Sequence, residues 1–584
     1  MNIDLRANPF FLTEEDCDWV HETIAAMNDE EKVGQLFFQL TSSQKEEDLI
    51  ELIQTYHLGG CRYNPAPARE VWKQNRILQE NSKIPLFIAC NTESGGDGAC
   101  TDGTYIGNGM KIGATGNHDY AEDMGRMGNA EAAAIGCNMA FAPVCDIYYN
   151  PMNTEISTRA FSNDPEMVKK CSVEYVRGAH QNTDFACVAK HFPGNGVDYR
   201  DAHLSNHVND FSPKHWDETY GMVYKELIEN GVEGIMLPEY VRELAPELPE
   251  EEVWMPATLN KTLMTTLLRD KLGFQGVVVT DASHMVAMTN QMTRKEMLPR
   301  AINAGCDMFL FFNDPQEDFQ TMLTAYQRGV ISEERMTEAL TRILGIKARL
   351  QLHKKSAAEM VPEKDTLDRV LGNEEFKKKQ SEISEKSLTL VKYKDKDVLP
   401  ISPEKYKKVM IVHIKGHETG MVELLKLCGM EGKNPAETVK QKLCERGYDA
   451  YVYESPLDQM KQKALKGEKP DLNIYFAGKN AISEFREQAD LVITLCDVMA
   501  GRPSFGMSKG GGEIPWYVFE VPVIAVGCGQ PTMLSDIPQV RTYINIYDAK
   551  ENTLEKLIEA LSSGADAFVG KDPIDSFCGL QDTK

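Results

Sequence analysis

The sequence predicts an α/β fold, a (β/α)8 TIM barrel followed by an α/β doubly wound sandwich domain. In the first half of the chain, eight short apolar runs alternate with helical patterns, which is typical of repeated βα units around a parallel sheet. Eight is also the number of strands that closes such a barrel. The length of 584 residues exceeds the size at which a single core stops growing, so a second domain is expected.

The predicted barrel strands follow one another from residue 34 to residue 312. They are GQLFFQL (34–40), GGCRY (59–63), PLFIACN (85–91), NMAFAPVCD (138–146), ACVAKHF (186–192), EGIMLPE (233–239), GVVVTD (276–281) and CDMFLFF (306–312). Helices with recognisable ends separate them. One opens with Asp164 as N-cap and Pro165 in its first turn, and another opens with Asn260 and ends at Gly273.

A charged, helix-prone segment at residues 354–385 is the predicted helical linker. It separates the barrel, residues 1–353, from the sandwich domain, residues 386–584. In that domain apolar runs again alternate with helical patterns, as in an open sheet covered on both faces. The runs are LTLVKY (388–393), KKVMIVHI (407–414), YDAYVYE (448–454), LNIYFAG (472–478), ADLVITLCD (489–497), VPVIAVGCG (521–529) and RTYINIY (541–547).

Composition argues against several classes of partner. A net charge of −25 repels the phosphates of nucleic acids and anionic lipid headgroups. The N-terminus lacks the basic and apolar regions of a secretory leader, and no segment supplies the roughly 18 apolar residues of a spanning helix. The 14 cysteines are scattered without a C-x-x-C pair, as expected of reduced thiols. We expect a cytoplasmic protein that binds neither nucleic acid nor membranes, and its oligomeric state stays open.

Polar side chains stand at the ends of several predicted strands, where a barrel of this kind forms its active site. They are Asn91 with nearby Glu93, Asp146, Lys190, His191, Glu239 and Asp281. One such carboxylate alone is often a helix cap or a solvated turn, and Asp281 could cap the helix that follows it. Convergence of these groups on one rim favours a functional site.

The fifth predicted strand runs into KHFPGNGVDYRDAH (190–203). Lys190 and His191 are consecutive, so their side chains diverge unless the irregularity that Pro193 and Gly194 allow brings both to the barrel mouth. An Asp beside a His holds the imidazole in one tautomer and raises its pKa. Asp201 and His203 therefore form a candidate proton donor and acceptor near neutral pH.

The same loop has a rival interpretation as a metal site. His203 and His207 are four residues apart, and His191 and His215 flank them. However, the H-E-x-x-H pattern is missing and no further Cys or His falls at ligand spacing. The sequence therefore favours neither a metal nor an organic cofactor.

KHFPGNGVDYRDAH resembles the K-H-F-P-G-[HD]-G…D-x-H signature of family 3 glycoside hydrolases, in their β-N-acetylhexosaminidase branch. GFQGVVVTDASHM is similar to the nucleophile segment of that family, and PATLN and AINAGCDMFL match further family patterns. The second half resembles the accessory α/β sandwich of two-domain members. The resemblance implies an exo-acting glycosidase that removes terminal β-N-acetylglucosamine from a small carbohydrate substrate without a cofactor.

The resemblance also implies a retaining mechanism. Asp281 would be the nucleophile that forms a covalent glycosyl-enzyme, His203 the acid/base, and Asp201 the dyad partner of His203. An imidazole carries no negative charge when it acts as a base, so an anion such as phosphate can approach the intermediate. Phosphorolysis therefore stays open as an alternative to hydrolysis.

Four further residues would bind hydroxyls of the sugar in the innermost subsite. They are Lys190, His191, Arg159 and Asn91. Many relatives have D-Q-E-G-G-R-V-x-R where this chain has NTESGGDGAC, so Asn91 replaces a sugar-binding Asp. This departure leaves the sugar and the aglycone open among muropeptide fragments, chitooligosaccharides and glycoprotein sugars. A β-glucosidase or β-xylosidase of the same family, and a non-catalytic sugar-binding protein, are the remaining alternatives.

Overall fold

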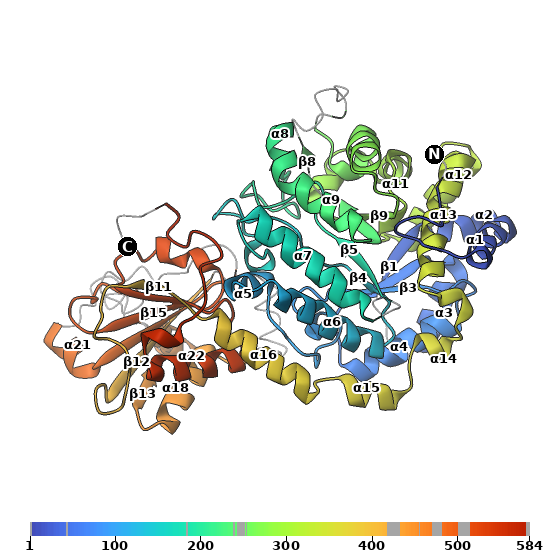
Figure 1. Cartoon of the computed structure of the whole chain (residues 1–584). Coiled ribbons are helices and arrows are strands. Elements are labelled where there is room, and N and C mark those ends of the chain that lie inside the picture. Colours follow the sequence, from blue (N-terminus) through green and yellow to red (C-terminus); the bar gives the residue numbers. More distant parts are fainter. Residues whose placement is uncertain are drawn as a thin grey trace. The chain divides into compact units, whose positions relative to one another are not determined.

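The computed structural model describes residues 3–41, 45–182, 185–237, 240–241, 252, 254–416, 432–454, 456–469, 482–499 and 514–579. The chain forms two compact units, one of Met1–Gly109 with His118–Lys379 and one of Met110–Asn117 with Gln380–Lys584. Figure 1 colours most of the first unit blue through yellow and most of the second orange to red. None of the helices in the described part of the chain has the length and apolar character needed to cross a membrane.

The first unit contains a closed barrel of eight parallel strands in the order β1-β10-β9-β7-β5-β4-β3-β2 (Figure 1). The strands are β1 (Phe37–Thr41), β2 (Gly60–Tyr63), β3 (Phe87–Cys90), β4 (Met139–Ala140), β5 (Ala186–Ala189), β7 (Gly234–Leu237), β9 (Val277–Ala282) and β10 (Met308–Leu310). Each strand overlaps one of the eight predicted apolar runs, so the prediction of a TIM barrel is confirmed. The sixth run also includes Glu239, which lies outside the described residues.

Helices alternate with these strands along the chain. They are α1 (Glu14–Ala26), α2 (Asp29–Gly34), α3 (Glu46–Tyr56), α4 (Ala68–Glu80), α6 (Asp119–Ala134), α7 (Pro165–His180), α9 (Met222–Glu229), the π-helix η6 (Leu263–Lys271), α11 (Arg294–Ala304), α12 (Pro315–Gln327) and α13 (Glu333–Arg349). The predicted cap Asp164 accepts the backbone N–H of Glu166 at 3.1 Å, and Asn260 Oδ1 accepts that of Leu263 at 2.9 Å. Both predicted helix starts therefore rest on the expected side-chain bonds.

The second unit is built on a six-stranded sheet with the order β11-β16-β15-β14-β12-β13. The strands are β11 (Thr389–Tyr393), β12 (Lys408–Lys415), β13 (Asp449–Val452), β14 (Leu491–Asp497), β15 (Val523–Gly527) and β16 (Thr542–Asn545). All neighbours are parallel except β11, which pairs antiparallel with β16. The predicted run LNIYFAG lies outside the described residues.

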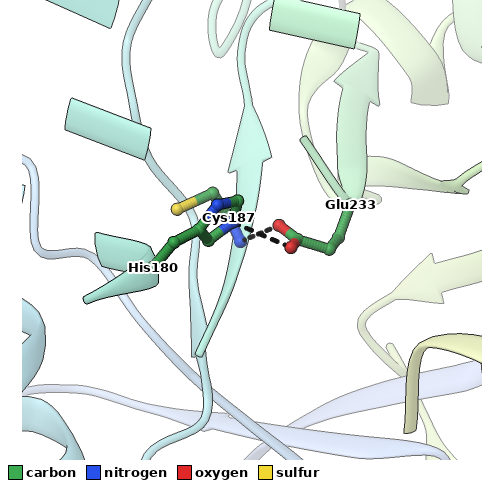
Figure 2. Close-up of side chains that lie close together, drawn as sticks. All are labelled: His180, Cys187 and Glu233. Carbon is green, nitrogen blue, oxygen red and sulfur yellow. Dashed lines mark hydrogen bonds and ion pairs between the residues drawn. The ribbon is translucent and has the colours of Figure 1, made fainter. Parts of the chain in front are cut away.

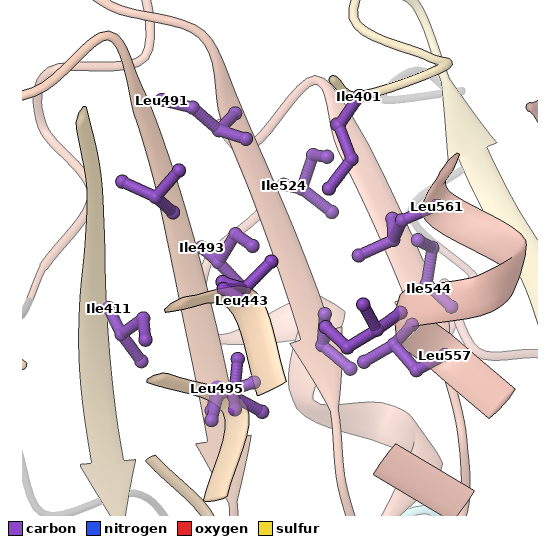
Figure 3. Packing of buried hydrophobic residues seen from close by; sticks show 14 of the residues in the cluster. Ile401, Ile411, Leu443, Leu491, Ile493, Leu495, Ile524, Ile544, Leu557 and Leu561 are labelled. Atoms are coloured by element: carbon purple, nitrogen blue, oxygen red, sulfur yellow. The ribbon is translucent and has the colours of Figure 1, made fainter. Parts of the chain in front are cut away.

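Apolar side chains are buried on both faces of this sheet, which confirms the predicted α/β sandwich. On one face, Leu443 of α18 (Pro435–Glu445) and Leu557 of α22 (Glu551–Ser563) pack against residues such as Ile493 (Figure 3). On the other face, a second cluster includes Phe485 of α21 (Ile482–Gln488) and Met533. Parallel strands read as continuous apolar runs because they are covered in this way.

The segment predicted as a linker carries α14 (Ala357–Met360), α15 (Lys364–Val370) and most of α16 (Glu374–Ser387). The second unit also includes nearly all of α5 (Gly109–Ala114), although this helix comes from the first third of the chain. Lys111 of α5 is fully buried and donates to Asp548 Oδ2 at 2.7 Å and to Ser384 Oγ at 2.9 Å. The sequence pattern did not indicate this packing.

Candidate active site

A cavity of about 400 Å³ lies at the carboxyl ends of the barrel strands. Six of the seven predicted site residues line it: Asn91, Arg159, Lys190, His191, His203 and Asp281. The seventh, Asp201, is hydrogen-bonded to His203. The structure therefore brings together residues that are up to 190 positions apart in the sequence, and the cavity has the size of a small-molecule site.

Asp281 lies near the end of β9, after three buried valines. Its Oδ1 accepts the backbone N–H of Ala282 at 2.6 Å. The next helix, α10 (Val286–Thr289), has Met285 at its N-cap position, so Asp281 does not cap it. The carboxylate is therefore held at the cavity by its strand and can meet an electrophilic carbon there.

His203 and Asp201 form a hydrogen-bonded pair at the cavity. Asp201 Oδ1 lies 2.8 Å from Nδ1 of His203 and also accepts the backbone N–H of His203 at 2.8 Å. This hydrogen bond raises the pKa of His203 to about 9, and the charges of Asp201, Glu155 and Asp281 add to it. Burial alone would raise the pKa of Asp201, but the bonds from His203 outweigh it and hold that pKa below its usual value. The imidazole can thus give and take a proton through Nε2, since Nδ1 faces Asp201.

A second carboxylate supports this loop. Glu155 is buried, accepts the backbone N–H of Ala202 at 3.0 Å, and has Oε1 at 3.7 Å from His203 Nδ1. The loop also docks on the segment that follows the nucleophile candidate: the backbone N–H groups of Val286 and Ala287 donate to His203 and Ala202, both at 3.3 Å. The positions of His203 and Asp281 are therefore coupled through the backbone.

Lys190 and Arg159 share the carboxylate of Glu93. Lys190 Nζ lies 2.5 Å from Glu93 Oε1, and Arg159 donates from Nε at 2.8 Å and from Nη2 at 3.0 Å. Burial alone would raise the pKa of Glu93, but the two cations outweigh it and hold that pKa far below its usual value. Burial also lowers the pKa of Lys190, which Glu93 partly offsets. The pair thus presents fixed hydrogen-bond donors to the cavity.

His191 is oriented by Asp146, which lies in the segment after β4. Its Nδ1 lies 2.6 Å from Asp146 Oδ2, and its backbone N–H donates to Asp146 Oδ1 at 3.1 Å. The Lys190–His191 peptide bond is cis, and both side chains line the cavity. Gly194 has a φ of +127°, and a Cβ there would meet the Tyr220 ring at 2.2 Å, so the predicted turn needs glycine at this position.

Asn91 lies at the end of β3, and its buried Oδ1 has no hydrogen-bond partner within the described residues. It is therefore available to a ligand hydroxyl. Arg62 of β2 lines the same cavity and was missed by the sequence reasoning, as were the supporting roles of Glu93, Asp146 and Glu155. Arg62 is the polar residue near the end of the predicted run GGCRY, and this position could have indicated it from the sequence. The partners of Glu93, Asp146 and Glu155 could be identified only in the tertiary structure, because these contacts join segments far apart in the sequence.

The rival metal interpretation does not fit the histidine geometry. His191 and His203 are engaged by different carboxylates, Asp146 and Asp201, so these histidines do not share a site. Glu155, Asp201 and His203 lie close enough together to hold an ion, but Asp201 Oδ1 is already bonded to Nδ1 of His203. Another group of potential ligands, His180, Cys187 and Glu233, lies at the opposite ends of the barrel strands (Figure 2). There Glu233 Oε1 lies 2.8 Å from His180 Nε2 and 2.7 Å from a guanidinium nitrogen of Arg349.

Glu233 also accepts the backbone N–H of Cys187 at 2.9 Å, and burial raises the pKa of the Cys187 thiol well above its usual value. A carboxylate already neutralised by a guanidinium, next to a protonated thiol, is a poor metal ligand set. We assign a structural role to this group, because its contacts join α7, β5 and α13.

A larger hollow of about 1000 Å³ lies on the outside of the barrel, lined mainly by α11 and α12. Its lining includes Lys295 and Glu317 and none of the strand-end residues described above. The convergence of titratable groups therefore favours the smaller cavity as the active site.

Comparison with known proteins identifies the family of the chain. A family model described as "Glycosyl hydrolase family 3 N terminal domain" matches residues 29–346. The "Beta-N-acetylglucosaminidase/beta-glucosidase" of Cellulomonas fimi is 36% identical over the whole of both chains. A solved "Beta-glucoside phosphorylase BglX" has a TM-score of 0.87 and 33% identity over 99% of each chain. A β-N-acetylglucosaminidase from Paenibacillus sp. str. FPU-7, with a TM-score of 0.76, 24% identity and coverage of 94% of this chain and 99% of that one, shares the fold.

Proposed function

From the premise that this chain belongs to glycosyl hydrolase family 3, as its sequence resemblance predicted, we propose that it is a retaining exo-β-N-acetylglucosaminidase. The observation that carries the proposal is that His203, hydrogen-bonded to Asp201, lines the same cavity as Asp281. A retaining mechanism needs a nucleophile on one side of the anomeric carbon and a proton donor at the leaving oxygen. Asp281 and His203 both line the cavity, which supports these two roles.

In the first step, Asp281 attacks C1 of the bound sugar and the bond from C1 to the leaving oxygen breaks. His203, protonated because its pKa is about 9, donates its Nε2 proton to that oxygen. Lys190, His191, Arg159 and Asn91 hold the sugar hydroxyls, so that the ring lies with C1 toward Asp281.

In the second step, the imidazole accepts a proton from water, whose oxygen forms a bond to C1 as the ester of Asp281 breaks. The carboxylate of Asp281 is one of the charges that raise the pKa of His203. Esterification removes this charge and so lowers the pKa of His203, which favours the neutral imidazole that the second step needs as its base. The two steps thus need opposite protonation states, and the chemistry at Asp281 favours each in turn.

Phosphorolysis is the second candidate. The imidazole carries no negative charge as a base, and one solved structure that covers 99% of this chain is named a phosphorylase. Phosphate would take the place of water at C1, and the product would be a sugar 1-phosphate. This reaction competes with hydrolysis in the same cavity and uses the same intermediate.

The proposed sugar is β-N-acetylglucosamine, and β-glucose is the nearest alternative, since the full-length relative from C. fimi is named for both. We further propose that the protein acts in the cytoplasm. Buried free cysteines such as Cys90, Cys187 and Cys496 support a reducing compartment.

The test is release of p-nitrophenol from its β-N-acetylglucosaminide and β-glucoside by the purified protein, with and without phosphate. Faster turnover of the first supports the proposed sugar, and detection of a sugar 1-phosphate separates phosphorolysis from hydrolysis. Saturable sugar binding without any turnover would contradict both candidates.

A further inference from the structure

Arg62 is a cavity-lining cation whose guanidinium makes no hydrogen bond or ion pair with any described residue. The other cations of the cavity have dedicated carboxylates. Arg159 and Lys190 share Glu93, and the two histidines have their own aspartates. A partly buried guanidinium without a partner is costly to desolvate, so its presence in a cavity indicates a ligand.

The charge that acts most strongly on Arg62 is that of Asp281. Asp281 is the proposed nucleophile, and its carboxylate becomes a neutral ester in the glycosyl-enzyme. Formation of the intermediate therefore removes the main anion that faces Arg62. Once the ester has formed, the positive charge of Arg62 is less compensated and attracts a new anion into the cavity.

The neighbouring part of the wall carries amides instead of carboxylates. β2 pairs in parallel with β3, and Asn64 and Asn91, which directly follow these two strands, both line the cavity. A guanidinium offers donors in a planar fork that matches the oxygens of a phosphoryl group. Neutral amides beside it do not repel that group.

We propose that Arg62 binds a phosphoryl group in the cavity. The proposal rests on the proposed function, because it assumes the ester of Asp281. The phosphoryl group arrives either as inorganic phosphate or as a substituent of the bound sugar. In the first case an oxygen of hydrogen phosphate attacks C1, the bond from C1 to Asp281 breaks, and its electron pair returns to the carboxylate, which releases sugar 1-phosphate.

The first arm of the test isolates the second half-reaction. The enzyme is treated with 5-fluoro-β-N-acetylglucosaminyl fluoride, the adduct is verified by intact mass, and release of the sugar from the adduct is followed against phosphate concentration. The unaltered enzyme should reactivate with saturation by phosphate, and Arg62→Met should lower the phosphate-dependent rate by about ten- to a hundredfold. Arg62→Lys should recover part of this loss. A missing adduct would contradict the proposed function, whereas an adduct that both enzymes release equally would rule out inorganic phosphate as the ligand of Arg62.

The second arm compares an aryl β-N-acetylglucosaminide with its 6-phosphate. If the phosphoryl group belongs to the sugar, the unaltered enzyme prefers the 6-phosphate in kcat/KM, and Arg62→Met removes that preference. The control is Arg69→Met, which changes an exposed arginine of α4 outside the cavity and should alter neither arm. If Arg62→Met does not fold, Arg62→Lys and Arg62→Gln are compared in its place. Only lysine keeps the positive charge, so Arg62→Lys should keep more of the phosphate-dependent rate or of the preference for the 6-phosphate than Arg62→Gln. Equal behaviour of these two variants in both arms overturns the proposal.

Discussion

Oδ1 of Asp201 lies 2.8 Å from Nδ1 of His203 and accepts the backbone N–H of the same histidine. One carboxylate oxygen therefore fixes both the ring and the peptide that carries it. The pair leaves Nε2 of the imidazole for substrate, and its hydrogen bond is the main reason that the pKa of His203 rises to about 9. The first prediction tests this relationship directly.

Asp201→Asn should move the alkaline limb of activity to lower pH. The raised pKa of His203 keeps the proton donor charged up to about pH 9, and the amide removes the largest cause of that shift. The protonated form is then lost as pH rises through a lower value, toward the usual 6.5. The pH dependence of kcat/KM on a substrate with a poor leaving group measures the shift. An alkaline limb that stays in place would contradict the assignment of His203 as the acid.

His203→Ala should harm substrates unequally. Natural glycosides need protonation of the leaving oxygen, so their kcat/KM should fall by about a hundred- to ten-thousandfold. Aryl glycosides with good leaving groups should lose far less in the first step. The measurement is a plot of log kcat/KM against leaving-group pKa, whose slope should steepen in the variant. Equal losses across the series would rule out general acid catalysis by this residue.

Asp281→Asn should reduce turnover of every substrate by on the order of a thousandfold or more, because no covalent intermediate can form. Activated aryl substrates should be affected as strongly as poor ones. Intact mass after treatment with 5-fluoro-β-N-acetylglucosaminyl fluoride should show an adduct on the unaltered protein and none on this variant. Adduct formation on the variant would place the nucleophile elsewhere.

Glu93→Gln should cost both stability and substrate affinity. It leaves Lys190 and Arg159 without their shared carboxylate, and Lys190 is only 4% exposed at its side chain. Breaking such a pair should lower the free energy of unfolding by on the order of 3 kcal/mol. The control Glu80→Gln breaks the more exposed pair with Arg76 and should cost less than about 1 kcal/mol. Denaturant unfolding of the two variants checks the difference, and KM should rise only for Glu93→Gln.

Lys347 provides a pH dependence of stability away from the active site. Burial lowers its pKa to about 7, and its Nζ donates to Gln35 Oε1 at 2.7 Å. Between pH 7 and 10.5 the unfolded chain therefore binds more protons at this lysine than the folded chain, so this lysine makes stability rise with pH.

Lys347→Met should flatten that rise, as measured by denaturant unfolding at several pH values between 7 and 10. The control Lys214→Met, at a side chain that is 85% exposed, should keep the slope of the unaltered protein. An unchanged slope in Lys347→Met would mean that this lysine stays charged in the fold.

Much of the fold could be predicted because apolar periodicity is local. The run GVVVTD predicts a buried strand that ends in a carboxylate, and the structure has β9 with Asp281 at the cavity. The helix after Asp164 was equally predictable from its cap and Pro165. The packing of Lys111 against Asp548 was not, since no local pattern records a contact across more than 400 residues.

The sequence by itself determined the barrel, the sandwich and the residues that reach the strand ends, because strand and helix patterns depend on neighbours along the chain. Only the tertiary structure decided how these residues are paired: which cations share Glu93, which aspartate orients His191, and that Arg62 faces the cavity without a partner in the described chain. Pairing depends on distances between strands that are far apart in sequence. Electrostatic energy follows those distances, so the chemistry of the site depends on the closed barrel.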